Sequence, residues 1–196
     1  MSDEADGQTS DEPTGPLEVD VVGVQIVPSE GISIVLLAEL ETVDRVLPIF
    51  IGPVEAQAIA LAIEGVAPPR PFTHDLFVAT LEAAGAQITD LLITALDRGT
   101  FLAELGLATA AGERRIDARP SDGLALALRV GAPVRVKPRL FAAASVPVVG
   151  GADDSFTDDE IDRIVDEFRG FIDAADPSDF AEPDDPPDPH DPPAGP

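Results

Sequence analysis

The sequence predicts an α+β domain built on a mixed, mostly antiparallel β-sheet. Groups of β-rich runs alternate with groups of helical segments, rather than strand and helix alternating one by one. Short turn sequences separate neighbouring runs, as in hairpins. No strand-like run is followed by GxGxxG or GxxxxGK[ST], so neither a dinucleotide site nor a P-loop is expected. A chain of 196 residues is long enough for one domain with tails.

Three β-rich runs open the predicted domain, at residues 19–27, 32–40 and 45–52. The turn PSEG joins the first two and predicts a hairpin. The segment 52–65 predicts a helix, because Pro53 suits the first helical position and Gly65 is a good stop.

A second helix is predicted within residues 71–85. Thr73 can serve as its N-cap, and Gly85 can end it. His74 and Asp75 then lie in the first turn, at the positive end of the helix dipole.

The remaining elements repeat the pattern of strands followed by helices. The predicted strands are 86–96, 100–109, 114–119 and 133–137, of which the first two form a hairpin through DRG. A helix is predicted at 120–131, and one or two helical turns at 138–145. The stretch 157–176 is an amphipathic helix, because its large apolar residues recur on one stripe.

These elements define the expected domain organisation. Residues 19–146 form the folded domain, 147–156 a linker and 157–176 the C-terminal helix. Residues 1–18 are an acidic tail and 177–196 a Pro/Asp-rich tail, and both are expected to be disordered. Most of the net charge of −25 lies in the two ends of the chain, which favours solubility and opposes adventitious binding of nucleic acid.

Composition excludes several classes of protein. The chain has no cysteine, so disulfides, thiolate zinc sites and cysteine nucleophiles are excluded. No apolar run has the roughly 18 residues of a membrane helix, and the N-terminus lacks the features of a signal peptide, so we expect a cytoplasmic protein without a membrane partner. Only one basic residue, Lys137, is a lysine. This scarcity suggests salt adaptation, as in a haloarchaeal-like protein, although a GC-rich genome would also favour arginine.

Polar residues are concentrated at three predicted helix starts or the strand ends before them. They are Glu55; Arg70, Thr73, His74 and Asp75; and Asp117, Arg119, Ser121 and Asp122. Helix N-termini favour anions, and arginine can bind phosphate through two hydrogen bonds. Carboxylates and imidazole are ligands of Mg²⁺, Mn²⁺ or Ca²⁺, and His74 is the natural general base. Structural roles remain open for the same residues: the acids can simply favour helix dipoles, and Asp117 with Arg119 can form an ion pair.

The ordered phrases RPFTHDL and IDARPSDGLALALR carry a resemblance to a known family. With the segments around them, from about Val19 to Ser145, the chain resembles the bifunctional nuclease domain family. The resemblance implies a compact α+β domain, a homodimer, and cleavage of DNA and RNA. The residues that match the family's polar motif positions are Glu55, Arg70, His74, Asp75, Asp117, Arg119, Ser121 and Asp122.

The resulting first hypothesis is a nuclease acting by metal-assisted phosphodiester hydrolysis. Catalysis is assigned to His74, Asp75 and Asp117. Substrate binding is assigned to Arg70, Arg119 and Ser121. A divalent metal, Mg²⁺ or Mn²⁺, is assigned to Glu55, Asp117 and Asp122.

Two other hypotheses belong to different classes. The same groups can form a non-catalytic module that binds a small anion or a nucleotide. The domain can also be an interaction module whose acidic tails recruit a partner. The chain has no Trp or Tyr, and the five Phe residues of the domain lie in apolar runs, so few platforms for base stacking are expected. The nuclease hypothesis requires His74 to lie close to Asp117, Arg119 and Asp122.

Overall fold

The computed structural model describes residues 15–27, 31–40, 42–148 and 156–175 and confirms the α+β class. Its elements, in chain order, are β1 (Leu17–Val27), β2 (Ile32–Glu39), β3 (Thr42–Ile51), α1 (Pro53–Ile63), α2 (Thr73–Ala83), β4 (Gln87–Asp97), β5 (Thr100–Thr109), β6 (Gly112–Ala118), α3 (Pro120–Val130), β7 (Val134–Val136), α4 (Pro138–Ala144), β8 (Val146–Pro147) and α5 (Asp158–Ala174). Residues 1–14 of the predicted N-terminal tail, most of the linker and the predicted C-terminal tail fall outside the described residues. Leu17 and Glu18, which the sequence prediction places in the disordered N-terminal tail, are instead the first residues of β1.

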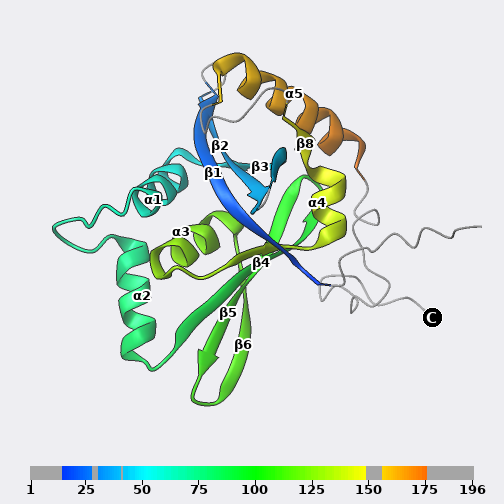
Figure 1. Cartoon of the computed structure of the whole chain (residues 1–196). Helices are drawn as coiled ribbons and strands as arrows, with labels where there is room; N and C mark the ends of the chain where they lie inside the picture. Colours follow the sequence, from blue (N-terminus) through cyan, green and yellow to red (C-terminus); the bar gives the residue numbers. More distant parts are fainter. Residues whose placement is uncertain (1–14, 28–30, 41, 149–155, 176–196) are drawn as a thin grey trace, which may run out of the picture.

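Among the described residues, the strands form one sheet in the order β6-β5-β4-β7-β1-β2-β3-β8. Two antiparallel meanders, β1-β2-β3 and β4-β5-β6, are joined by the short strand β7. β7 pairs antiparallel with β1 and parallel with β4, which makes the sheet mixed. In Figure 1, α1, α2 and α3 gather on one side of the view and α4 and α5 on the other.

Several strands are longer than predicted because pairing continues past the apolar run. β1 begins at Leu17, where Leu17 and Glu18 pair with Val136 and Arg135 of β7. β8 is absent from the sequence prediction, since only two residues pair with β3.

The start of α2 differs from the sequence prediction. Phe72 is the N-cap residue, and Thr73 is the first residue of the helix, so the prediction of Thr73 as N-cap is wrong. Asp75 Oδ2 accepts a hydrogen bond from the Phe72 backbone N–H at 2.8 Å. The capping group is therefore a carboxylate from within the first turn.

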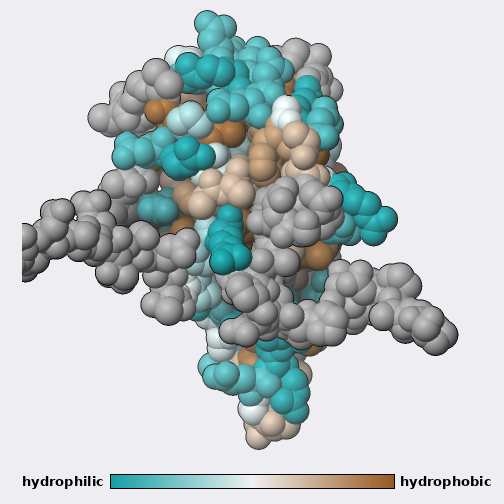
Figure 2. All heavy atoms as spheres, turned by 90° about the vertical axis from the view of Figure 1, so that its right-hand side faces the viewer, coloured by the Kyte–Doolittle hydropathy of each residue, from teal (hydrophilic) through white to brown (hydrophobic). Residues whose placement is uncertain are grey.

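The C-terminal helix α5 is part of the same core as the sheet. Its buried residues are Ile161, Ile164, Val165 and Phe168, which lie on one stripe as predicted. α5 contacts β1, β3 and β8. Figure 2 views the side of α4 and α5, and the surface in its upper part, where α5 lies, is largely hydrophilic. The helix thus buries its apolar face and turns its acids to solvent.

In the part of the chain that the structure describes, none of the helices combines the length and the apolar character needed to cross a membrane.

Candidate functional site

His74 and Asp122 meet between α2 and α3. The His74 Nε2 atom lies 3.4 Å from Asp122 Oδ1, although the residues are 48 positions apart. The His74 side chain is 19% exposed and that of Asp122 35% exposed, so the pair is accessible from one side. If Nε2 carries the proton that Asp122 accepts, Nδ1 is left as a proton acceptor.

Arg119 links the pair of His74 and Asp122 to α1. It is the N-cap residue of α3, and its guanidinium donates to both carboxylate oxygens of Asp122, at 2.8 and 3.1 Å. Its Nη1 also donates to Glu55 Oε1 at 3.1 Å. His74, Asp122, Arg119 and Glu55 therefore form a continuous chain from α2 across α3 to α1, which we call the polar cluster.

Charges within the polar cluster shift its protonation equilibria. Burial alone would raise the pKa of Asp122, but hydrogen bonds from Arg119 and His74 outweigh it and hold this pKa below its usual range. The hydrogen bond to Asp122 raises the pKa of Arg119, and the bond to Glu55 adds to this. Asp122 is thus a carboxylate at neutral pH and can stabilise a positive charge on His74.

Two of the three helices of the polar cluster, α1 and α3, begin close together, because Arg119 at the N-cap of α3 bonds Glu55 in the first turn of α1. α1 and α3 pack together, and each has proline at its first turn. Their first-turn amides lack intrahelical partners and carry the positive end of the helix dipole. This end of the site is favourable for an anion.

A pocket of about 220 Å³ opens beside Glu55 and Arg119. Its wall comes from the end of β3, the start of α1, the turn between β4 and β5, the start of α3, and α5. The lining residues are Ile49, Phe50, Ile51, Gly52, Glu55, Gly99, Thr100, Phe101, Arg119, Pro120, Ser121 and Phe168. We call it the α1/α3 pocket.

Asp75 lies next to His74 but has a different partner. Asp75 Oδ1 accepts a hydrogen bond from Arg129 Nε at 2.6 Å. That bond, together with the one from the Phe72 N–H, holds the pKa of Asp75 below its usual range. Asp75 therefore links α2 to α3 through Arg129. Its carboxylate bonds Arg129 and the Phe72 N–H, and not the residues of the polar cluster.

Of the other predicted site residues that the structure describes, Ser121 lies beside the polar cluster, whereas Asp117 and Arg70 make no contact with it. Asp117 lies in β6 two positions after Arg115, which bonds Asp90 on the sheet face opposite α3. Since side chains alternate along a strand, Asp117 is on that opposite face, and Arg119 pairs with Asp122 and Glu55 instead. Arg70 is exposed in the segment before α2, and Ser121 is buried at the start of α3 and lines the α1/α3 pocket.

The arrangement does not fit a divalent metal as it stands. Among the described residues, no group of three or more His, Asp or Glu side chains is placed to hold a metal ion. Of the predicted ligands, Glu55 and Asp122 are bridged by the Arg119 guanidinium, and Asp117 lies on the other face of the sheet.

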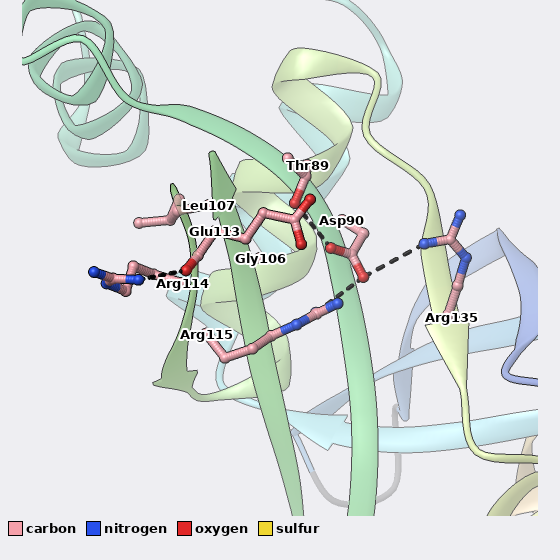
Figure 3. Close-up of a pocket in the computed structure, with 8 residues that line it drawn as sticks. All are labelled: Thr89, Asp90, Gly106, Leu107, Glu113, Arg114, Arg115 and Arg135. Carbon is pink, nitrogen blue, oxygen red and sulfur yellow. Dashed lines mark hydrogen bonds and ion pairs between the residues drawn. The ribbon is translucent and has the colours of Figure 1, made fainter. Parts of the chain in front are cut away.

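A second pocket, of about 350 Å³, lies over β4, β5 and β6 (Figure 3). Asp90 is 4% exposed and pairs with Arg115 at 2.9 Å and with Arg135 at 3.4 Å. Figure 3 shows these two arginines reaching Asp90 from opposite sides, while Arg114 points away. The Asp90 carboxylate thus offsets the charge of both arginines and links β4 to β6 and β7, which is a structural role.

Sequence reasoning missed Arg129 and Asp90. Arg129 sits in the apolar run LALALRV, and Asp90 in the run QITDLLI, where a single charged residue is usually taken as solvent-facing. A lone charge among buried positions was the available signal, since such a residue must find a partner.

The chain is similar to known proteins along most of its length. Residues 35–149 match a family model described as the bifunctional nuclease domain. Two proteins of Mycobacterium tuberculosis, both named as uncharacterised, from strains CDC 1551 / Oshkosh and ATCC 25618 / H37Rv, are each 39% identical to this chain over 163 residues. The alignment covers 83% of this chain and 97% of each relative. These relatives are mycobacterial, so the expected haloarchaeal-like origin is not supported.

Proposed function

The chain belongs to the bifunctional nuclease domain family, and from this premise we propose that it is a nuclease whose reaction centre is the polar cluster. The observation that carries the proposal is the contact of His74 with Asp122 beside an exposed arginine and two helix N-termini. Together these supply a proton acceptor, a carboxylate that orients it, and donors for a phosphate.

In the proposed hydrolysis, His74 accepts a proton from the attacking water as its oxygen bonds to phosphorus. The P–O bond to the leaving nucleoside oxygen breaks, and that oxygen takes up a proton from solvent. Asp122 holds the ring through Nε2 and stabilises the imidazolium that forms, while Nδ1 takes the proton. The 3.4 Å separation is long for a hydrogen bond, as is common in catalytic sites without substrate.

Arg119 is the proposed phosphate ligand. Its side chain is 64% exposed, and exposed ion pairs contribute only about 0–1 kcal/mol. Its guanidinium can therefore exchange a carboxylate partner for a phosphate at little cost. The first-turn amides of α1 and α3 would add donors to the same oxygens.

A requirement for Mg²⁺ or Mn²⁺ remains part of the proposal, but we derive no step through a metal. A divalent ion would have to displace Arg119 from Glu55 and Asp122. Cleavage measured in EDTA and with added Mn²⁺ tests this directly. Equal rates in both conditions would remove the metal from the proposal.

The central experiment compares cleavage of labelled DNA and RNA, single-stranded and duplex, by wild type, His74→Ala and Arg119→Ala. Loss of a general base lowers the rate about 10²–10⁴-fold, so we expect that loss for His74→Ala. Arg119→Ala should mainly raise KM. Arg163→Ala, which removes an exposed arginine on α5, is the matched control and should leave kcat/KM within about twofold.

The thermal midpoint of every variant must be measured alongside cleavage. Unchanged cleavage by His74→Ala at unchanged stability would show that the activity is a contaminant or belongs to another site.

A non-catalytic anion- or nucleotide-binding module is the second candidate. Arg119 bonded to two carboxylates is a stable arrangement that needs no reaction. Calorimetric titration with nucleotides separates the two proposals, because heat of binding without cleavage favours the second.

A further inference from the structure

We propose that the α1/α3 pocket is a nucleobase subsite, which takes one unpaired base of a single-stranded substrate. This inference rests on the proposed nuclease function and adds a substrate class to it. The argument depends on the wall of the pocket, its size, and its position next to the polar cluster.

The wall of the pocket is aromatic. Phe50, Phe101 and Phe168 all line it, from β3, β5 and α5. The Phe101 and Phe168 rings are nearly parallel, with centroids 5.9 Å apart and an interplanar angle of 5°, and Phe50 lies 5.6 Å from Phe168. Phe168 and Phe101 are 0% and 6% exposed, so they form the buried floor of the pocket, and Phe50, which is half-buried, is the ring that a base would contact. Contact of bases with aromatic rings is a common way of binding single-stranded nucleic acid. The sequence suggested few stacking platforms because the chain lacks Trp and Tyr and the five Phe residues of the domain lie in apolar runs.

The size of the pocket suits one base. A cavity of about 150 Å³ is large enough to bind benzene. The volume of about 220 Å³ therefore admits a single base, whereas a stacked base pair is too large. The subsite thus favours single-stranded over duplex substrate.

The pocket opens onto the polar cluster. Glu55 and Arg119 belong to both, and Ser121 and Thr100 are also at the lining. A base held in the pocket would place its own phosphate near Arg119 and the first-turn amides of α1 and α3. The Glu55 carboxylate can accept a hydrogen bond from an exocyclic amino group, as cytosine and adenine present.

Part of the wall comes from outside the segment that matches the family model. That match ends at residue 149, while α5 spans Asp158–Ala174. Phe168 is fully buried against the pocket, and the side chain of Ile172 lies 3.1 Å from where a Cβ of Gly99 would be. α5 therefore closes the pocket and sets its size.

The test is binding of nucleoside 5′-monophosphates and of ribose 5-phosphate to the full chain, measured by calorimetry. Wild type should bind a monophosphate at least tenfold more tightly than the sugar phosphate, because only the former carries a base. Thr100→Phe fills the pocket from an exposed position and should weaken monophosphate binding about tenfold, with sugar-phosphate binding unchanged.

Thr109→Phe, at the other end of β5, is the control and should leave both affinities within twofold. Thr100→Leu replaces Thr100→Phe if the larger side chain lowers the thermal midpoint. Equal affinity for monophosphate and sugar phosphate, or no effect of a folded Thr100 variant, would overturn the subsite.

Cleavage assays separate this inference from the nuclease proposal. If wild type cleaves and the folded Thr100→Phe variant cleaves single strands equally well, the subsite is wrong and the nuclease proposal stands. If wild type binds monophosphates through the pocket but cleaves nothing, the subsite stands and the nuclease proposal is wrong.

Discussion

Arg129 is the residue on which the position of α2 depends most. Its side chain is 11% exposed and donates to Asp75, to the Ala58 carbonyl in α1 and to the Ala125 carbonyl in α3. α2 has no fully buried residue of its own. This single guanidinium therefore joins three helices and holds the first turn of α2, with His74, against Asp122.

We predict that Arg129→Met lowers the free energy of unfolding by about 3 kcal/mol, because it breaks a largely buried ion pair and removes the side-chain donor from two helix carbonyls. The loss should depend on pH. Since the pKa of Asp75 is lowered in the folded state, its pair with Arg129 contributes fully above the ordinary value of 3.8 and is lost as pH falls through the lowered value. The difference between variant and wild type should shrink below pH 3.8.

Denaturant unfolding from about pH 7 to about pH 2.5 measures this difference across the range in which the Asp75 carboxylate takes up its proton. Asp75→Asn is the comparison, since it removes the charge and keeps the shape. A difference that stays constant over the whole range would show that Asp75 is not the partner that matters.

Gly123 is required by packing between α3 and β4. A Cβ at this position would clash with the side chain of Leu91, which is completely buried. We predict that Gly123→Ala is destabilising by about 1–3 kcal/mol, although alanine is the better helix former. Thermal unfolding of Gly123→Ala and of the double variant Leu91→Val with Gly123→Ala checks the cause, because a smaller side chain at position 91 should restore part of the loss.

Elements with a clear period or turn could be predicted from the sequence. The hairpins β1-β2 and β4-β5 and the amphipathic helix α5 are confirmed. β8 could not be predicted, because two residues carry no period and only pairing with β3 makes them a strand. The predicted cap of α2 is wrong because a first-turn carboxylate replaces the expected hydroxyl.

α5 offers a test of element stability that leaves its packing intact. Thr157 caps it, accepting from the Glu160 N–H, and Gly170 is an exposed helical position where an added Cβ would meet no atom within 4 Å. We predict that Thr157→Ala lowers the free energy of unfolding by about 1 kcal/mol. Gly170→Ala should raise it by about 0.5–1 kcal/mol. Chemical denaturation measures the free energy of unfolding of both variants. Changes of the same sign would contradict the roles given to Thr157 as cap and to Gly170 as an exposed helical position.

At the scale of the whole molecule, strand β7 brings the two meanders together. The sequence motifs could predict that His74, Arg119, Asp122 and Glu55 carry related chemistry, and the structure places them in one chain of contacts. The position of Asp117 could not be predicted from spacing. It depends on which face of the sheet each side chain of β6 points to, and strand alternation places Asp117 on the same face as Arg115, which pairs with Asp90.

The molecule should unfold as one unit that includes α5. Phe168 is completely buried among the rings of Phe50, Phe101 and Phe171, so sheet and helix share one set of contacts. Phe168→Ala should lower the free energy of unfolding by about 3–5 kcal/mol, through lost burial and the cavity left behind.

Calorimetry should still show a single transition for this variant, with the calorimetric and van't Hoff enthalpies equal. An early separate transition, with the loss of helical signal expected for α5 alone, would show instead that α5 is an independent unit. The α1/α3 pocket would then lose a wall whenever α5 unfolds. Cooperative unfolding is therefore what a pocket of fixed size requires, since only a helix that shares the stability of the sheet can hold Phe168 in place.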